Sequence, residues 1–335
     1  MQVASQNIAP WRISCAPMMD WTDRYCRAFH RMLTRRSVLF TEMVTAGAVV
    51  HGDRAGILGF DVLEEPVVLQ LGGSDPEELA PAAEAAATFG YRSLNLNCGC
   101  PSDRVQKGRF GACLMAEPAL VRDCVSAMAA ASGLPVSIKC RIGIDAQEDY
   151  ADLRRFVDIV GEGGVGCFYV HARKAWLQGL SPKQNREIPP LRYEVVQRLK
   201  AERADLQIHL NGGILSLDQA AAALAWADGV MIGRAAYRNP FLLASVDSRF
   251  HGDTNPVSSR AEAVEGLVAL GGRLREEGRP LKDLARHTLG LMNGLPGARV
   301  WRRMIGEGMR DPAAEPNLFR QGFASVRERS ARDAA

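Results

Sequence analysis

Residues 93–101, Ser-Leu-Asn-Leu-Asn-Cys-Gly-Cys-Pro, begin as an apolar β-type segment and end in a glycine–proline turn that carries two cysteines. The apolar part predicts a buried strand. A strand end is a rigid place to mount a reactive side chain, and proline restricts the turn that follows. Cys98 and Cys100 therefore have three candidate roles: a proton donor beside a bound molecule, a buried structural cysteine, or part of a metal or disulfide site.

The metal and disulfide roles find little support in the rest of the chain. Structural zinc sites usually space their cysteines two to four residues apart and need a second pair. The sequence has eight cysteines but no second close pair, so we predict no metal and interpret the cysteines as reduced thiols. Residues 1–10 lack a signal-peptide pattern, and no apolar run of 18 residues is present. We therefore expect a cytoplasmic protein.

The segment at 93–97 is one of eight short, apolar, β-rich runs along the chain. With helical segments between them, the runs cover residues 13–17, 38–41, 67–71, 93–97, 136–139, 167–171, 208–211 and 229–232. Several are apolar throughout, as expected for strands buried on both faces. Eight alternations of strand and helix predict a (β/α)8 TIM barrel. Residues 57–63 look like a hairpin before the third strand.

The end of the chain has a different pattern. A polar stretch at 252–256 predicts a linker, and the residues beyond it place apolar side chains at helical spacing, as at Ala263, Leu267 and Leu274. We therefore predict a barrel domain over residues 1–250 and an all-helical C-terminal domain over residues 256–335. The net charge of +3 is modest and does not by itself indicate a nucleic-acid partner.

Polar residues stand where four consecutive strands should end. Gln70, Asn97, Lys139 and His171 close the third to the sixth runs. In a barrel of this kind the C-terminal ends of the strands form one face, which carries the active site. A lone histidine is more often a satisfied core residue, but four polar residues at one face predict a functional site.

The last two strands predict a phosphate site. Asn211, Gly212 and Gly213 follow the seventh strand, and Gly233 and Arg234 follow the eighth. Loops at these positions often bind phosphate through backbone N–H groups, which glycine lets a ligand approach closely. An arginine adds a charged clamp.

A flavin would fit beside this phosphate site. The Lys139 ammonium could stabilise negative charge on a reduced ring, and Gln70 and His171 could hydrogen-bond its polar edge. The backbone beside the ring would come from the end of the first strand, at Pro17, Met18 and Met19.

At these residues the sequence resembles the tRNA-dihydrouridine synthases, specifically the synthase A subfamily. The motif Asn-x-Asn-Cys-Gly-Cys-Pro marks the family strongly, and the stretch 175–183 with Asn185-Arg186-Glu187 is similar to the A subfamily. The matching segments cover the barrel in order, at 16–23, 41–43, 69–73, 95–101, 138–143, 171–176, 211–214 and 231–234.

The resemblance implies an activity and roles for individual residues. The family reduces the C5–C6 double bond of a uridine in tRNA with FMN as cofactor and NADPH as reductant, and the A subfamily acts on D-loop positions 20 and 20a. Cys100 would protonate C5 while the reduced flavin delivers hydride to C6. A thiol is largely protonated at neutral pH and suits this role. Cys98 would be structural, and Asn97 is a candidate for contacting the target base.

The resemblance also assigns residues to the tRNA, namely Lys183, Arg186, Arg299 and Arg302. The spacing of Arg299, Arg302 and Arg303 independently places three guanidinium groups on one helix face. A uridine that must leave its stack needs such a basic surface around it. The alternative is an ordinary solvated face with Glu307 as an ion-pair partner. A ligand as large as tRNA over the barrel favours a monomer.

Two other functions fit part of the pattern. A dihydroorotate dehydrogenase-like enzyme would also handle a dihydropyrimidine at FMN, but it would need no basic helix face. A non-catalytic tRNA-binding scaffold would have lost its flavin, and the complete set of strand-end residues argues against that loss.

Overall fold

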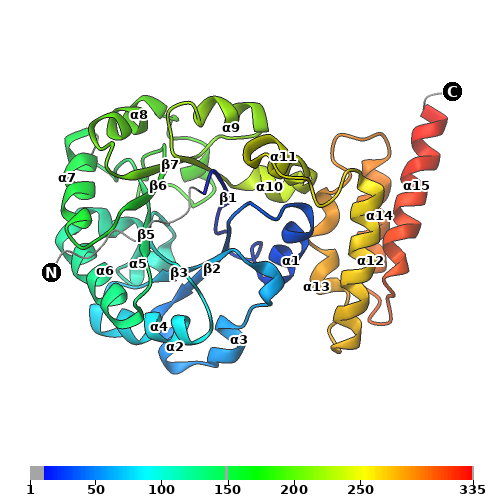
Figure 1. The fold of residues 1–335 in the computed structure, drawn as a ribbon, viewed down its shortest axis with the longest axis horizontal. Helices are drawn as coiled ribbons and strands as arrows, with labels where there is room; N and C mark the ends of the chain where they lie inside the picture. Colours follow the sequence, from blue (N-terminus) through cyan, green and yellow to red (C-terminus); the bar gives the residue numbers. More distant parts are fainter. Residues whose placement is uncertain (1–10, 148–149, 334–335) are drawn as a thin grey trace. The chain divides into compact units, whose positions relative to one another are not determined.

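The computed structural model describes residues 11–147 and 150–333 (Figure 1). Residues 1–10, from which no export signal is expected, lie outside this part. The chain forms two compact units. The first consists of the chain up to Met19, Val38–Phe60 and Pro66–Ile232; the second consists of Asp20–Ser37, Asp61–Glu65 and the chain from Gly233 onward. These units interleave along the sequence, whereas the predicted domains, 1–250 and 256–335, do not, and that domain boundary stays a prediction.

The first unit is a barrel of eight parallel strands, which confirms the predicted fold class (Figure 1). Neighbouring strands follow the order β1-β8-β7-β6-β5-β4-β3-β2. The ring closes where Cys15 N donates to Val38 O over 2.8 Å and Val38 N donates to Ile13 O over 3.0 Å. The strands are β1 (Ile13–Cys15), β2 (Leu39–Thr45), β3 (Val67–Gly72), β4 (Leu94–Cys98), β5 (Val136–Arg141), β6 (Cys167–His171), β7 (Gln207–Asn211) and β8 (Gly229–Ile232).

Burial on both faces of the strands explains why these segments are apolar throughout rather than alternating apolar and polar residues. Every residue of β3, β4 and β8 is buried, because side chains fill the inside of the barrel and helices cover the outside. Inside the barrel the Phe40 and Tyr169 rings meet edge to face with centroids 5.1 Å apart. The Tyr169 ring also lies 4.5 Å from the His209 ring.

The helices of the first unit lie outside these strands, with α4, α6, α7 and α8 clearly seen in Figure 1. Side chains cap the N-termini of two of them, since the Asp75 carboxylate accepts from Glu77 N and the Ser216 hydroxyl accepts from Gln219 N. The helices are α2 (Ala46–His51), α3 (Arg54–Leu58), α4 (Pro76–Thr88), α5 (Asp103–Lys107), η2 (Gly111–Ala116), α6 (Pro118–Ser132), α7 (Tyr150–Gly161), η3 (Gln184–Arg186), α8 (Tyr193–Glu202) and α9 (Leu217–Ala223).

The hairpin predicted for residues 57–63 is wrong. This segment holds the end of α3, which belongs to the first unit, and the start of a 3-10 helix, η1 (Val62–Glu64), in the second. Asp61 caps η1 by accepting from Leu63 N, and Glu64 accepts from Asp61 N in return. This capping box favours a helical turn over an extended pair of strands.

The regular secondary structure in the described residues of the second unit is all helical, and α12, α14 and α15 lie side by side within it (Figure 1). The buried Asp247 carboxylate joins its early and late segments, because it accepts from Thr34 Oγ1, from Arg35 N at 2.7 Å and from Arg36 N at 3.1 Å. The helices are α1 (Arg24–Leu33), η1, α10 (Arg234–Arg238), η4 (Pro240–Ser245), α11 (Val246–His251), α12 (Arg260–Glu276), α13 (Lys282–Ala285), η5 (Thr288–Gly290), α14 (Ala298–Gly308) and α15 (Asn317–Asp333).

Helices of the kind that cross membranes are missing from the described residues, where none is both long and apolar enough.

Candidate functional site

The strand register brings several of the predicted residues together at the C-terminal ends of the strands. Asn97 on β4 is level with Lys139 on β5. Two residues further along β5, Arg141 is level with His171 on β6, which is level with Asn211 on β7. A polar layer therefore crosses from β4 to β7 at the face where barrels of this kind bind their ligands.

A chain of hydrogen bonds orients Gln70 beneath this layer. Asn97 Nδ2 donates to Gln70 Oε1 over 2.8 Å, and Gln70 Nε2 donates to Asn95 Oδ1 over 2.7 Å. Asn95 Nδ2 donates to Ser137 Oγ over 2.9 Å, and that hydroxyl donates to Leu94 O over 3.0 Å. All the donors point the same way toward a backbone carbonyl, so the amide of Gln70 is held in one orientation with one N–H left over.

The same Asn97 side chain shapes the turn that carries Cys100. Its Oδ1 accepts from Gly99 N at 3.1 Å and from Cys100 N at 2.9 Å. The half-buried Cys100 thiol lies 3.5 Å from the Ser102 hydroxyl. Cys98 is fully buried, and burial raises the pKa of its thiol well above its usual range. The two thiols thus stand in very different surroundings, and only Cys100 is open to a ligand.

Lys139 reaches across the barrel from β5 to β7. Its ammonium donates to Asn211 Oδ1 over 3.1 Å, and Asn211 Nδ2 donates to Met231 O over 2.8 Å. Burial, together with the charge of Arg141, lowers the pKa of Lys139 to about 8. A lysine in this state is still mostly charged at neutral pH, and its bonded partner is a neutral amide rather than a carboxylate.

His171 lies beside these cations as a neutral ring. Burial, together with the charges of Arg141 and Lys139, holds the pKa of His171 well below its usual range. Its Nδ1 is buried and makes no hydrogen bond with any described residue. A buried ring nitrogen without a partner is costly, so this atom fits a site that a polar ligand group completes.

The backbone after β7 requires glycine at two successive positions. Gly212 and Gly213 have φ angles of 108° and 73°, a region that favours glycine. A Cβ on Gly212 would lie 3.1 Å from the His171 ring, and one on Gly213 would lie 2.4 Å from the Leu191 side chain. Tyr193 Oη donates to Gly212 O over 2.6 Å and fixes the turn. Both the backbone conformation and the neighbouring side chains therefore exclude any residue other than glycine here.

The loop after β6 presents the predicted tRNA residues Lys183 and Arg186, and both are exposed around η3. Between them, Asn185 is fully buried. Asn185 Oδ1 accepts from Trp176 N and Asn185 Nδ2 donates to Trp176 O, each over 2.8 Å. The Trp176 ring is 41% exposed, with the Lys174 ammonium 4.1 Å from its centre. The loop is thus a folded surface of basic and aromatic side chains.

Sequence reasoning missed Arg141. Its side chain is buried, and burial lowers its pKa to about 10. It donates to Gly99 O in the Cys100 turn and to two carbonyls of the β6 loop. Its place in the sequence, two residues after Lys139 at the end of β5, is the signal that could have identified it.

The remaining predicted cofactor residues follow the first and last strands. Pro17 and Met18 are half-buried after β1, and Met19 is 55% exposed. Gly233 follows β8 in the chain and precedes Arg234, the first residue of α10. Both belong to the second unit.

The predicted basic helix face exists on α14 within the second unit. Arg299, Arg302 and Arg303 are exposed, while Trp301 and Ile305 on the opposite side are buried. No carboxylate in the described chain pairs with these three arginines. The ion pair to Glu307 that belongs to the alternative interpretation of this face is therefore absent from the described part of the chain.

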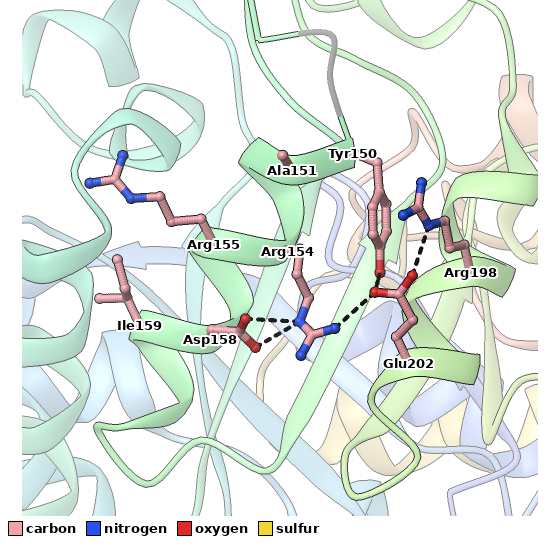
Figure 2. A pocket seen from close by; sticks show the side chains of 8 residues that line it. All are labelled: Tyr150, Ala151, Arg154, Arg155, Asp158, Ile159, Arg198 and Glu202. Atoms are coloured by element: carbon pink, nitrogen blue, oxygen red, sulfur yellow. Dashed lines mark hydrogen bonds and ion pairs between the residues drawn. The ribbon is translucent and has the colours of Figure 1, made fainter.

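A hollow between α7 and α8 is lined by both acidic and basic side chains (Figure 2). Its central carboxylate, Glu202, accepts from Tyr150 Oη at 3.0 Å and from Arg154 and Arg198 at 2.8 Å. Asp158 also pairs with Arg154 over 2.8 Å. Because these groups satisfy one another, the hollow is a paired surface network.

Across the described residues, no three His, Cys, Asp or Glu side chains gather as a metal site would require. Disulfides are likewise absent from that part of the chain.

Comparison with known proteins agrees with this picture. A model of the dihydrouridine synthase family matches residues 14–325. A protein of Xanthomonas campestris pv. campestris named tRNA-dihydrouridine(20/20a) synthase is 52% identical over 97% of this chain and 96% of its own length. A protein of Vibrio vulnificus with the same name is 51% identical over 94% of this chain and 97% of its own. The solved structure of morphinone reductase shares the fold with a TM-score of 0.52 and 13% identity, over 75% of this chain and 88% of that one.

Proposed function

The chain belongs to the dihydrouridine synthase family and is an oxidoreductase, and from this premise we propose that it reduces uridines 20 and 20a of tRNA to 5,6-dihydrouridine. The positions follow from the names of relatives that are about half identical over nearly the whole chain. The observation that carries the proposal is the half-buried Cys100 thiol, held by Asn97 at the same strand ends as Lys139 and His171.

The residues at these strand ends fit FMN. Among the described residues His171 Nδ1 has no partner, the Lys139 ammonium is bonded to a neutral amide, and two glycines with positive φ follow β7. When bound, FMN would supply the hydride for C6 after its own reduction by NADPH. The residues proposed to hold it are Gln70, Lys139, His171, Asn211, Gly212 and Gly213, joined by Pro17, Met18, Met19, Gly233 and Arg234.

The proton for C5 would come from Cys100. A hydride at C6 and a proton at C5 together account for the two hydrogen atoms that the double bond gains. The thiolate left on Cys100 recovers its proton from water. The Ser102 hydroxyl, 3.5 Å from the sulfur, is placed to hydrogen-bond that thiolate.

The exposed cations would bind the tRNA backbone. Lys183 and Arg186 lie on the β6 loop, and Arg299 and Arg302 lie on α14 in the helical part of the chain. Each phosphate contact that is lost should lower the slope of log affinity against log salt concentration by about 0.7–0.9. This slope separates residues that touch phosphate from residues that only stabilise the fold.

The test compares Cys100→Ala with Cys113→Ala, a second half-buried cysteine whose thiol contacts Phe110 O. Flavin absorbance, flavin reduction by NADPH and dihydrouridine formation in unmodified tRNA are measured for each. We expect Cys100→Ala to keep the first two and to lose the third by about 10²-fold or more. Normal dihydrouridine formation by Cys100→Ala would contradict the proposal.

The same protein preparation tests the alternatives. Turnover of free dihydroorotate without binding of tRNA would favour a dihydroorotate dehydrogenase-like enzyme. A colourless protein that binds tRNA would favour a scaffold.

A further inference from the structure

Two side chains join the turn that carries Cys100 to the β6 loop, which is defined here as residues 172–187. The first is Arg141 on β5. Its Nε donates to Gly99 O over 3.1 Å, and its Nη1 donates to Asn185 O over 2.9 Å and to Lys174 O over 3.3 Å. One planar guanidinium therefore spans the residue before Cys100 and two points of the loop.

The second bridge is Gln106 on α5. Its Nε2 donates to Pro101 O over 2.8 Å and to Leu177 O over 2.7 Å, which uses both N–H groups of the amide. The carbonyl before Cys100 and the carbonyl after it are thus each held by a side chain that also holds the β6 loop. Two separate elements, β5 and α5, make the same connection.

Hydrogen bonds within the β6 loop and to a neighbouring loop hold it in one conformation. Asn185 binds both backbone groups of Trp176, and the Asp145 carboxylate accepts from Leu177 N over 2.8 Å. The proposed tRNA contacts Lys183 and Arg186 flank Asn185 in the chain. These two residues are therefore connected, through Asn185 and Arg141, to the turn that carries Cys100.

The energetic cost of Arg141 supports a role beyond stability. Its side chain is 5% exposed, and the hydrogen bonds described above all go to neutral carbonyls. A buried charge without a countercharge is expensive. A lysine would keep the charge, but it cannot reach several carbonyls in one plane.

We propose that Arg141 and Gln106 are positioning residues that couple tRNA contact on the β6 loop to the placement of the Cys100 thiol. The inference rests on the proposed function and adds a source of selectivity to it. Binding energy from the tRNA backbone is used to place the proton donor, so a uridine outside a tRNA is reduced slowly.

The first experiment uses no enzymatic activity. Cys100 alkylation by iodoacetamide is followed by peptide mass spectrometry in the free protein, for Gln106→Met and Arg141→Lys. The matched controls are Gln321→Met and Arg155→Lys, which alter exposed side chains. We expect alkylation of Cys100 to rise about threefold or more in the two bridge variants only, because the turn is released. Unchanged rates in both bridge variants overturn the inference.

The second experiment measures coupling in the reaction itself. Single-turnover reduction at saturating tRNA is measured in wild type, Lys183→Ala, Gln106→Met and the double variant. We expect Gln106→Met to slow this step about tenfold while flavin reduction by NADPH and tRNA affinity stay within about threefold. Lys183→Ala should slow the step in wild type but cause no further slowing beside Gln106→Met.

Additive effects of the two substitutions would overturn the coupling. Failure of the proposed function is a different outcome, because the wild-type protein would then form no dihydrouridine at all. The alkylation rates would still report whether the bridges hold the turn.

Discussion

Replacing Asn97 by alanine removes three hydrogen bonds from one nearly buried side chain, which is 7% exposed. Two of them hold Gly99 N and Cys100 N, and the third reaches Gln70 Oε1. At about 1 kcal/mol for each bond, we expect Asn97→Ala to lower the free energy of unfolding by about 3 kcal/mol. The Cys100 turn should also loosen, because both of its N–H groups lose their acceptor.

Urea unfolding followed by circular dichroism measures the stability, and the alkylation rate of Cys100 measures the turn. Asn293→Ala is the control, since Asn293 is exposed, and it should stay within about 0.5 kcal/mol of wild type. A loss below about 1 kcal/mol for Asn97→Ala, with Cys100 alkylated at the wild-type rate, would refute this account of the turn.

Three further outcomes follow from the structure. Gly213→Ala places a Cβ at a φ of 73° and should cost about 1–2 kcal/mol and lower the flavin content, whereas Gly166→Ala, with open space around it, should change neither. Burial holds the pKa of Lys139 near 8, against an ordinary 10.5; between these values the unfolded chain binds a proton that the folded chain has lost. The urea stability of wild type relative to Lys139→Met should therefore rise from pH 8 to 10.5, and a flat difference would contradict the cause given. Arg27 Nε lies 2.6 Å from Glu64 Oε2 with both side chains buried, so Arg27→Met should cost about 3–5 kcal/mol by thermal unfolding. Adding Glu64→Gln should restore much of that loss, and an equally unstable double variant would argue against a stranded carboxylate.

The strands were predictable because their signal is local. Apolar runs buried on both faces allow few other structures, and the end of each run then indicates which polar residue faces the ligand. The bridges made by Arg141 and Gln106 were not predictable, since their partners are backbone carbonyls up to 71 residues away. The prediction for residues 57–63 failed because the segment was interpreted as a hairpin, whereas the reciprocal cap between Asp61 and Glu64 favours a helical turn.

Positive charge gathers at these strand ends without a carboxylate to balance it. In the described chain, the hydrogen bonds of Lys139 and Arg141 go to neutral oxygens, and burial together with their charges holds the pKa of His171 well below its usual range. Unbalanced cations in a partly buried site favour a ligand that carries or develops negative charge. The proposed reaction cycle would place such charge at two points: on a flavin ring once NADPH has reduced it, and on the Cys100 sulfur once the thiol has given its proton. The same two cations interact favourably with a Cys100 thiolate. We therefore infer that one pair of side chains serves both halves of the addition, which explains why the cations and the thiol share one end of the barrel.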